Sequence, residues 1–415
     1  MIVFKFGGAS VKDVEGVKNL KKIISLYQNQ RLLVVVSAMG KMTNALEEVV
    51  KTRFFRNADF IPILTEIEDF HKKLVHGLSL EKTEVLNILE GYSQNIKDYL
   101  ENLGDQKYDE VYDQIISKGE LLSTTIINYY LSSEGVVNKW LDARKYIKTD
   151  ATFREAKINW EATKSSIDLL DADTNLFITQ GFIGGTADGK TTTLGREGSD
   201  YSASIFAHCL KAESVTIWKD VPGVLSADPR LFSEYEKFDQ LSYTEAVEMT
   251  YYGATVIHPK TIKPLQNSGI PLYVKPFLSP NEAGTVINSE DFKQKELSAI
   301  IVKKDQLLIS ISTKDFSFIS ELNISHIYEI FARLNLKCNV SQNSALSFTV
   351  CIDFDEMKFE ELIKALEVSF KIRYNQDVTL YTIRHFTDDV LSKILLGKTI
   401  ILEQLSRSTA QIVVK

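Results

Sequence analysis

Apolar and polar positions along the first 290 residues follow two repeats, one typical of buried strands and one typical of helices. Continuous apolar runs at 2–4 and 32–36 are typical of strands that are covered on both faces. Further strands are predicted near 136–147, 175–183 and 215–218. Apolar spacings of three and four predict helices throughout 58–132 and again at 199–212. This alternation predicts an α/β fold with a mostly parallel sheet and helices on both of its faces.

The pattern changes after a polar segment at 288–296, which predicts a linker. Beyond it, short strands near 307–312 and 346–351 flank helices near 324–334 and 359–368. This order is typical of a small α+β module of the βαββαβ kind. Part of the same pattern recurs near 378–414, so we predict two copies, the second of them degenerate.

The chain of 415 residues is therefore expected to contain a large domain and a tandem of small modules. The large α/β domain is predicted at 1–290. The tandem region is predicted at 297–415, with a first module at 305–376 and a second built from 297–304 plus 377–415. The strand predicted at 299–302 could complete the second module, or a partner chain could complete it.

Composition and charge narrow the class of protein. Hydrophobic residues make up 44% of the chain and charged residues 25%, as in ordinary globular proteins, and the net charge is −7. This acidic balance argues against binding to nucleic acid or to a membrane surface. No secretory signal pattern opens the chain and no apolar run approaches about 18 residues, so we expect a cytoplasmic protein without a membrane span.

The cysteines and histidines do not form a recognisable metal site. The three cysteines, Cys209, Cys338 and Cys351, are scattered and lack the spacing of a disulfide framework, so we expect them to be reduced thiols. His208 and His258 have no second ligand at a useful spacing. We expect His258 to order a loop, His208 to lie on a helix face, and no metal to be held by protein side chains alone.

The first candidate site follows the first predicted strand. Lys5 lies in that strand, and Gly7 and Gly8 follow it directly. Glycines at a strand end let backbone N–H groups approach an anion, and a lysine beside them can neutralise phosphate charge. The pattern is weak alone and gains weight from three further segments, so these three residues are candidates for phosphate binding.

The second candidate segment, 117–123 (SKGELLS), has two interpretations. Ser117 and Glu120 fit a helix-capping box, and this structural interpretation is favoured when the segment is taken alone. In the alternative interpretation, the carboxylate of Glu120 holds the ammonium group of a substrate.

The third region begins with a pattern that matches a nucleotide-binding loop by its letters. Residues 184–191 (GGTADGKT) follow the sequence G-x-x-x-x-G-K-[ST], which needs a strand before it and a helix after it. The next residues, 192–198 (TTLGREG), cannot begin a long helix. Asp188 and Gly189 lie between two β-rich runs, which predicts a hairpin turn in place of a phosphate-binding loop.

The glycine-broken segment 194–200 (LGREGSD) is the stronger candidate in this region. It leads into a helix whose N-cap we expect to be Ser199 or Asp200, and a helix N-terminus attracts anions. Arg196 can bind a carboxylate through two parallel hydrogen bonds. Asp200 is badly placed to bind an anionic substrate and well placed to orient lysines or a metal ion. The structural alternative is a capped helix with one surface arginine.

The fourth candidate segment, 218–230, follows another predicted strand. Asp220 lies at the strand end, ahead of a turn at Gly223, where open α/β sheets bind ligands. Asp220 could orient Mg²⁺ or a ribose, and Arg230 could meet phosphates. A surface turn is an equally good interpretation of this segment taken alone.

Six segments in this order closely resemble the aspartokinase family of the amino-acid kinase superfamily. The matching runs are 5–11 (KFGGASV), 36–44 (VSAMGKMTN), 117–123 (SKGELLS), 179–184 (TQGFIG), 191–201 (TTTLGREGSDY) and 218–223 (WKDVPG). The resemblance spans 1–290, and the C-terminal region resembles the family's paired ACT modules. It implies a three-layer amino-acid kinase fold, similar to that of carbamate kinase, followed by α+β ferredoxin-like ACT modules.

The resemblance also implies an activity and the residues that carry it. Aspartokinases transfer the γ-phosphoryl group of ATP to the β-carboxylate of L-aspartate, the first step of lysine, threonine and methionine biosynthesis. The implied catalytic residues are Lys5 and Asp200, with Asp200 orienting Lys5. The implied aspartate-binding residues are Ser37, Thr43, Glu120, Arg196 and Ser199. The implied nucleotide- or phosphate-binding residues are Gly7, Gly8, Lys219, Asp220, Gly223 and Arg230, with Mg²⁺ held mainly by the ATP phosphates.

Four positions depart from the family pattern around the nucleotide and the acceptor. Glu197 stands where many members have glycine or asparagine, which places a second acid near an anionic site. Lys219 replaces a frequent threonine. Leu225 replaces a tyrosine, and Thr255 a lysine, that some members use against the nucleotide. Lys260 or Lys219 could compensate for the lost lysine.

The implied regulatory region departs further. The stretch 318–326 lacks the glycine turn with which ACT modules commonly receive an amino-acid effector, and Asn339 replaces an acid that helps bind lysine in lysine-inhibited members. Inhibition by lysine or threonine is one hypothesis, and a structural role in a homodimer formed through the ACT modules is at least as well supported. A kinase for another small carboxylate and an inactive amino-acid sensor stay open as alternatives. The intact Lys5, Arg196 and Asp200 argue against the sensor.

Overall fold

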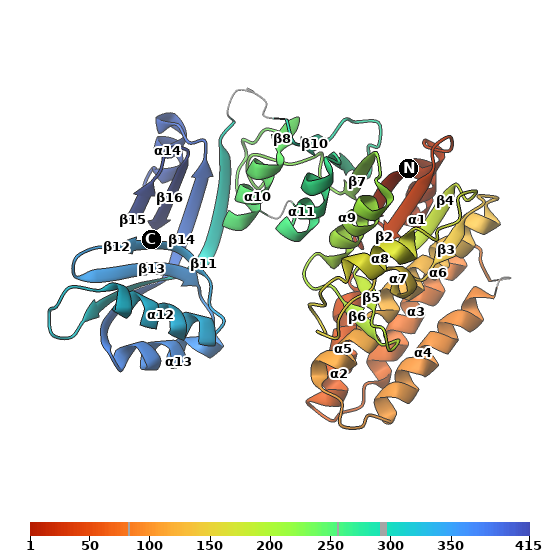
Figure 1. Cartoon of the computed structure of the whole chain (residues 1–415), viewed down its shortest axis with the longest axis horizontal. Coiled ribbons are helices and arrows are strands. Elements are labelled where there is room, and N and C mark those ends of the chain that lie inside the picture. Colours follow the sequence, from red (N-terminus) through yellow and green to blue (C-terminus); the bar gives the residue numbers. More distant parts are fainter. Residues whose placement is uncertain (82–83, 255–256, 291–296) are drawn as a thin grey trace. The chain divides into compact units, whose positions relative to one another are not determined.

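The structure is a computed structural model of the chain, and it describes residues 1–81, 84–254, 257–290 and 297–415 (Figure 1). The chain forms two compact units, and three segments of the sequence contribute to each. The first unit takes the described residues of 1–224, 237–247 and 256–292, and the second takes those of 225–236, 248–255 and 293–415. Most of the predicted linker, 291–296, lies outside the described residues.

The first unit is built around an eight-stranded sheet with the order β3-β4-β2-β1-β7-β9-β10-β8. Its strands are β1 (Ile2–Phe6), β2 (Leu32–Val36), β3 (Lys139–Leu141), β4 (Leu176–Gln180), β7 (Ser214–Lys219), β8 (Gln240–Ser242), β9 (Leu272–Pro276) and β10 (Thr285–Asn288). Its neighbouring strands are parallel, except that β9 and β10 are antiparallel. The prediction of a mostly parallel sheet is confirmed.

Helices cover both faces of this sheet. The helices that lie wholly in this unit are α1 (Val14–Ser25), α2 (Met42–Phe54), α3 (Ile61–Gly77), α4 (Val85–Glu101), α5 (Tyr108–Ile116), α6 (Lys118–Ser133), α7 (Ala143–Tyr146), α8 (Trp160–Ile167), α9 (Gly198–Leu210) and α11 (Pro259–Ser268). Phe4 and Phe6 point to the face that packs against α1 and α6. Because successive side chains of a strand point to opposite faces, Lys5 points to the other face, where α9 contacts β1.

The long helical segment forms a core of its own. Helices α2 to α5 pack together around buried side chains that include Leu46, Leu64 and Ile96. The helices predicted throughout 58–132 are α3, α4, α5 and α6, with short breaks between them. The predicted hairpin is also confirmed: β5 (Ile183–Gly185) and β6 (Thr191–Thr193) pair antiparallel. Because a strand follows the turn, the P-loop interpretation is excluded.

The second unit contains a six-stranded antiparallel sheet with the order β12-β13-β11-β14-β16-β15. Its strands are β11 (Ala299–Thr313), β12 (Cys338–Asn343), β13 (Ser347–Asp353), β14 (Phe370–Arg384), β15 (Ile400–Leu405) and β16 (Thr409–Val414), and its helices are α12 (Glu321–Arg333), α13 (Glu356–Glu367) and α14 (Asp388–Leu395). Helix α10 (Tyr243–Tyr252) is divided, because 243–247 belong to the first unit and 248–252 to the second. The α+β class predicted for this region is confirmed.

The two halves of this sheet share two long strands. Strands β11 and β14 pair along most of their length, and the pairing shifts near Asp305 and Asp377, which have positive φ angles of 54° and 55°. Residues 306–313 of β11 belong to the half that carries α12 and α13. Residues 299–303 pair with 380–384 of β14 in the other half. The strand that completes the second half therefore comes from the same chain.

Candidate active site

The carboxyl ends of four parallel strands bring the candidate segments to one edge of the large sheet. Phe6 pairs with Val36 on one side and with Trp218 on the other, and Val36 pairs in turn with Gln180. The strands β1, β2, β4 and β7 therefore end at the same level. The segments that follow them include four of the six motifs, and this edge is where open α/β sheets bind ligands.

Lys5 and Asp200 form a buried ion pair at this edge. Lys5 Nζ lies 2.6 Å from Asp200 Oδ1, and the two side chains are only 12% and 5% exposed. Burial alone would raise the pKa of Asp200, but the charges of Lys5 and Lys219 and the Lys5 hydrogen bond hold that pKa below its usual range. A Cβ built on Gly7 would lie 3.4 Å from Lys5 Nζ. The pair thus holds an ammonium group beside the glycines that follow β1.

The loop after β1 lies tightly against the loop after β2. The backbone N–H of Gly40 donates to the carbonyl of Gly8 at 2.9 Å, and the N–H of Ser37 donates to the carbonyl of Phe6 at 3.1 Å. A Cβ atom on Gly8 would lie 2.5 Å from the carbonyl oxygen of Ala38, so a larger residue there would force the backbone to shift. The close approach of these loops therefore requires glycine at position 8.

Gly8→Ala tests this close approach. The added methyl group would overlap the Ala38 carbonyl, and overpacking of this kind typically costs ~1–3 kcal/mol in the free energy of unfolding. We expect a lower midpoint of thermal unfolding and a turnover reduced at least about tenfold. Gly91→Ala is the matched control: it lies in α4 with open space around an added Cβ, and should stabilise the protein by ~0.5–1 kcal/mol. A Gly8→Ala variant with wild-type stability and turnover would contradict the geometry.

Glu120 presents a buried carboxyl group to the same loops. It lies in the first turn of α6 and is 2% exposed. Its Oε1 accepts a hydrogen bond from the backbone N–H of Ala38 at 3.3 Å, and its Oε2 has no hydrogen-bond partner among the described residues. Burial raises the pKa of Glu120 to about 8. A buried carboxyl oxygen without a partner is a suitable acceptor for a substrate ammonium group.

The capping-box interpretation of this segment is wrong. Ser117 has helical backbone angles, because α5 runs almost directly into α6, and it makes no side-chain cap to α6. Its hydroxyl donates instead to the carbonyl of Gln114 at 3.1 Å. The carboxylate of Glu120 is turned toward the loop after β2, so a tertiary contact replaces the local one.

Helix α9 begins earlier than predicted. Its N-cap is Glu197, and the prediction of Ser199 or Asp200 as the N-cap is wrong. A turn with positive φ angles of 77° at Gly195 and 53° at Glu197 starts the helix at Gly198. Ser199 and Asp200 consequently lie inside the first turn, from which Asp200 reaches Lys5.

The remaining acceptor candidates surround the same loops. Ser37 follows β2, and Thr43 is the second residue of α2. Ser199 lies against Gly181, since a Cβ on Gly181 would be 2.5 Å from the Cβ of Ser199. Arg196 is exposed in the loop before α9. Among the described residues no hydrogen bond joins Thr43, Arg196 or Ser199 to the other acceptor candidates. Ser37 and Glu120 are linked through the loop after β2, where the N–H of Ala38 donates to Glu120 Oε1.

Three nucleotide candidates lie at the end of β7 in the first unit. Lys219 is the last residue of β7, and its positive charge acts on the buried Asp200. Asp220 follows it and is exposed. Gly223 allows the turn to pass close to β10, because a Cβ there would lie 2.4 Å from Thr285 Oγ1. These three positions are adjacent to the Lys5–Asp200 pair through β7 and β1.

The other positions predicted near the nucleotide are placed differently. Arg230 belongs to the second unit, where its guanidinium pairs with Asp228 at 2.7 Å and its side chain is 82% exposed. Leu225 is half-buried and also belongs to the second unit. Thr255 lies outside the described residues. Lys219, Asp220 and Gly223 thus belong to the first unit, and Arg230 belongs to the second.

Asp113 is a buried acid that the sequence analysis did not single out. It lies in α5 and accepts hydrogen bonds from the backbone N–H and the hydroxyl of Thr193, at 2.8 and 2.7 Å, and from the N–H of Arg154. Burial raises the pKa of Asp113 to about 6 despite these bonds. Thr193 ends β6, three residues before Arg196, so Asp113 fixes the strand that leads to the arginine. Its one signal in the sequence is an acid among apolar residues at 111–116 (VYDQII).

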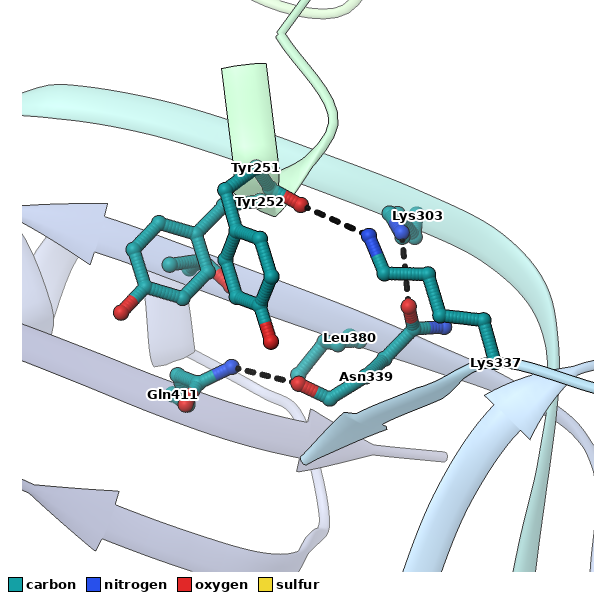
Figure 2. Close-up of a pocket in the computed structure, with 8 residues that line it drawn as sticks. Tyr251, Tyr252, Lys303, Lys337, Asn339, Leu380 and Gln411 are labelled. Carbon is teal, nitrogen blue, oxygen red and sulfur yellow. Dashed lines mark hydrogen bonds between the residues drawn. The ribbon is translucent and has the colours of Figure 1, made fainter. Parts of the chain in front are cut away.

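Figure 2 shows a pocket in the second unit, between the end of α10 and the six-stranded sheet. Lys337 Nζ donates to the carbonyl of Tyr251 at 3.3 Å and lies 4.4 Å from the centre of the Tyr251 ring. Asn339 accepts from Lys303 Nζ at 2.8 Å through its side chain and from Gln411 Nε2 at 3.2 Å through its carbonyl. The polar groups are paired with one another, and the pocket has no room for the centre of a water molecule. It is a packed contact, and we do not assign it to a substrate.

Metal-binding clusters and membrane spans are absent from the described part of the chain. It contains no group of three or more His, Cys, Asp or Glu side chains arranged to hold a metal ion. No helix in it is long and apolar enough to cross a membrane. His258 is the N-cap of α11, where its Nδ1 accepts from the N–H of Lys260 at 3.2 Å, and His208 Nδ1 lies 2.6 Å from Ser268 Oγ on the face of α9.

Known proteins show clear similarity to this chain. The amino acid kinase family matches residues 1–276. Lysine-sensitive aspartokinase 3 of Escherichia coli (strain K12) is 32% identical over 359 residues, which cover 85% of this chain and 78% of that protein. E. coli aspartokinase III solved in complex with aspartate and ADP (R-state) superposes with a TM-score of 0.83 at 27% identity, covering 100% of this chain and 96% of that one. The same enzyme in complex with lysine and aspartate (T-state) gives 0.82 at 27% identity, covering 100% and 95%.

Proposed function

The chain belongs to the amino acid kinase family and, within it, to the aspartokinases, and from this membership we propose that it phosphorylates the β-carboxylate of L-aspartate. In this reaction the bond between the γ-phosphorus of ATP and its bridging oxygen breaks, and a bond forms to a carboxylate oxygen. The products are ADP and 4-phospho-L-aspartate. The observation that carries the proposal is the buried Lys5–Asp200 pair beside the glycines at the end of β1.

The proposed phosphoryl-transfer end of the site is this pair with its glycines. Phosphoryl transfer depends on positioning and on neutralising the charge of the γ-phosphoryl oxygens. The Lys5 ammonium supplies positive charge, and the ion pair with Asp200 at 2.6 Å holds it in place. Gly7 and Gly8 leave backbone without side chains beside it, so that the phosphoryl group can approach closely.

The proposed acceptor end recognises the ammonium and carboxylate groups of aspartate. Glu120 receives the ammonium on its Oε2, which has no partner within the described chain. Arg196 holds a carboxylate of aspartate through two parallel hydrogen bonds. Ser37, Thr43 and Ser199 add hydroxyl groups around the acceptor. These assignments divide the site between an acid for the cation and an arginine for the anion.

The proposed nucleotide end is formed by Lys219, Asp220 and Gly223, and Arg230 stays a predicted phosphate contact. Bound Mg²⁺ neutralises charge on the ATP phosphates. Since the described residues offer no cluster of acids for a metal, we assign Mg²⁺ mainly to the phosphates, with Asp220 as the carboxylate at this strand end. Lys219 adds positive charge at the end of β7, beside the phosphates in this assignment.

Regulation by an amino acid and a homodimer formed through the ACT modules also belong to the proposal. The E. coli relative was solved with lysine. In this chain Asn339 donates to Gln306 and Asp353 at 2.8 and 2.9 Å and accepts from Lys303, so it is engaged within its own sheet.

The proposed homodimer has a direct test: light scattering on the purified chain should give the mass of a dimer. A cytoplasmic location stays a prediction from the sequence.

The engaged amide of Asn339 predicts weak control by an effector. A neutral amide carries no negative charge to form an ion pair with the side-chain ammonium of an effector lysine, and the loss of such a charged partner lowers affinity about tenfold or more. We therefore expect half-inhibition only at millimolar lysine or threonine, measured by titrating each amino acid into the kinase assay. Inhibition at micromolar concentrations would contradict this prediction, and no response at millimolar concentrations would remove the effector from the proposal.

A panel of acceptors tests the proposed function. ADP release from Mg·ATP should require L-aspartate, and succinate, which lacks the ammonium group, should react at least about a hundredfold more slowly. Equal turnover of succinate would overturn the role of Glu120. Turnover of another carboxylate, without turnover of aspartate, would show that the acceptor substrate is that carboxylate. Binding of an amino acid by calorimetry without any turnover would favour the sensor.

A further inference from the structure

The carboxylate of Glu197 links the starts of two helices. Its Oε2 accepts a hydrogen bond from the backbone N–H of His258 at 2.8 Å. His258 is the N-cap of α11, and Glu197 itself is the N-cap of α9. A carboxylate is stabilised at a helix N-terminus because free N–H groups and the helix dipole are positive there. Glu197 therefore starts one helix with its backbone and binds the start of the other with its side chain.

The backbone of Glu197 depends on its surroundings. Its φ of 53° and ψ of 28° lie in the left-handed region, which is unfavourable for a residue with a Cβ atom. The side chain makes no hydrogen bond to its own helix, so among the described residues the bond to His258 is what holds its position. The turn that starts α9 is thus fixed by α11 and not by local capping.

This turn carries three residues of the proposed site. Arg196 precedes Glu197, and Ser199 and Asp200 follow it within the first turn of α9. The carboxylate of Glu197 is engaged by the amide of His258, and the guanidinium of Arg196 makes no ion pair with any described carboxylate. An acid next to the arginine would otherwise compete with an anionic substrate. The bond to α11 gives that acid a partner of its own.

We infer that Glu197 is a positioning residue for the acceptor end of the site. By bonding to the start of α11, it fixes the left-handed turn between Arg196 and Ser199 and engages its own carboxylate at that helix start. The inference rests on the proposed role of Arg196 in binding a carboxylate of the acceptor. It gives a function to an acid that is unexpected beside an anion-binding arginine.

Two variants separate the backbone of Glu197 from its carboxylate. Glu197→Gly places at this position a residue that tolerates the left-handed conformation, and it removes the carboxylate with both its charge and its bond to His258. We expect the KM for aspartate to rise about five- to tenfold, with the KM for ATP within about twofold of wild type. Glu197→Gln keeps an acceptor oxygen and should stay within about twofold for both substrates. Glu15→Gln, at an exposed carboxylate in α1, is the matched control.

Amide hydrogen exchange provides a readout that does not need activity. Exchange in a peptide containing His258 should be faster in Glu197→Gly than in wild type and unchanged in Glu197→Gln. The inference is overturned by unchanged exchange in Glu197→Gly, by an equal rise in both KM values, or by a Glu197→Gln variant as impaired as Glu197→Gly. If wild type fails to phosphorylate aspartate, the proposed function fails, while the exchange experiment still decides whether Glu197 fixes the turn.

Discussion

Replacing Lys5 with alanine should lower kcat at saturating aspartate and ATP about a thousandfold or more. Preorganised positive charge at a transferring phosphoryl group supplies this order of rate enhancement in other enzymes. Here the charge is fixed by the ion pair with Asp200 at the end of β1. Steady-state ADP release on wild type and variant measures the loss directly.

The controls for this variant separate catalysis from folding. Removing Lys5 alone leaves the buried carboxylate of Asp200 without its partner, and a broken buried pair typically costs ~3–5 kcal/mol in the free energy of unfolding. A Lys5→Met/Asp200→Asn double variant removes both charges and should unfold much closer to the wild-type midpoint while staying equally inactive. Lys18→Ala, at a surface ion pair, should keep full activity. A folded Lys5→Ala variant with more than about a tenth of wild-type kcat would contradict the assignment.

Glu120→Gln should lower kcat/KM for aspartate about 10- to 100-fold. The amide carries no negative charge to pair with the substrate ammonium, and a hydrogen bond between charged groups contributes about 1.5–3 kcal/mol. The KM for ATP should change little, since the assigned contact is to the acceptor alone. Glu134→Gln, at an acid paired with Lys21 on the surface, is the matched control.

The pH profile gives this second prediction a sharper form. Burial raises the pKa of Glu120 to about 8, so the carboxyl is mostly protonated in the free protein at pH 7 and must ionise to bind an ammonium group. We expect kcat/KM for aspartate to rise about fivefold between pH 7 and 8 and by less than about twofold more up to pH 9, where it flattens, because kcat/KM reports the free enzyme. Glu120→Gln should lack this rise. The same rise in the variant would show that another group titrates.

The sequence predicts the framework of the kinase unit well because its strongest signals are local. The apolar run at β2 and the helical spacings after residue 58 can be recognised from neighbouring residues alone, without knowledge of which segments they pack against. The hairpin at Asp188 and Gly189 was likewise recognisable from its turn residues, against the letters of the P-loop pattern. Resemblance to a family added the order of the motifs and the activity they imply.

The capping box at the start of α6 and the start of α9 are both mispredicted because tertiary contacts override local capping; Ser117 itself is the N-cap of α6, as predicted. Ser117 and Glu120 have the spacing of a capping box, but Glu120 bonds to Ala38, 82 residues earlier in the chain. Ser199 is a good N-cap by type, but the turn at Glu197 starts α9 first. Local spacing cannot reveal an acceptor that lies in another loop.

Two other features could not be predicted because they join distant segments. Asp113 and Thr193 are 80 residues apart, and Glu197 and His258 are 61 residues apart.

In the second unit, the charges at 303–305 interrupt the apolar pattern, so the sequence predicts two short strands where the structure has one strand of 15 residues, β11. Pairing of that strand with β14 is what joins the two halves of the sheet.

Trapping the product with hydroxylamine tests the central claim most directly. An acyl phosphate reacts with hydroxylamine to give a hydroxamate and phosphate, so the assay detects the bond that the proposed reaction makes. With Mg·ATP and L-aspartate, wild type should form hydroxamate in step with ADP, and Lys5→Ala should form neither above background. ADP release without hydroxamate, or equal hydroxamate from both proteins, would contradict the account.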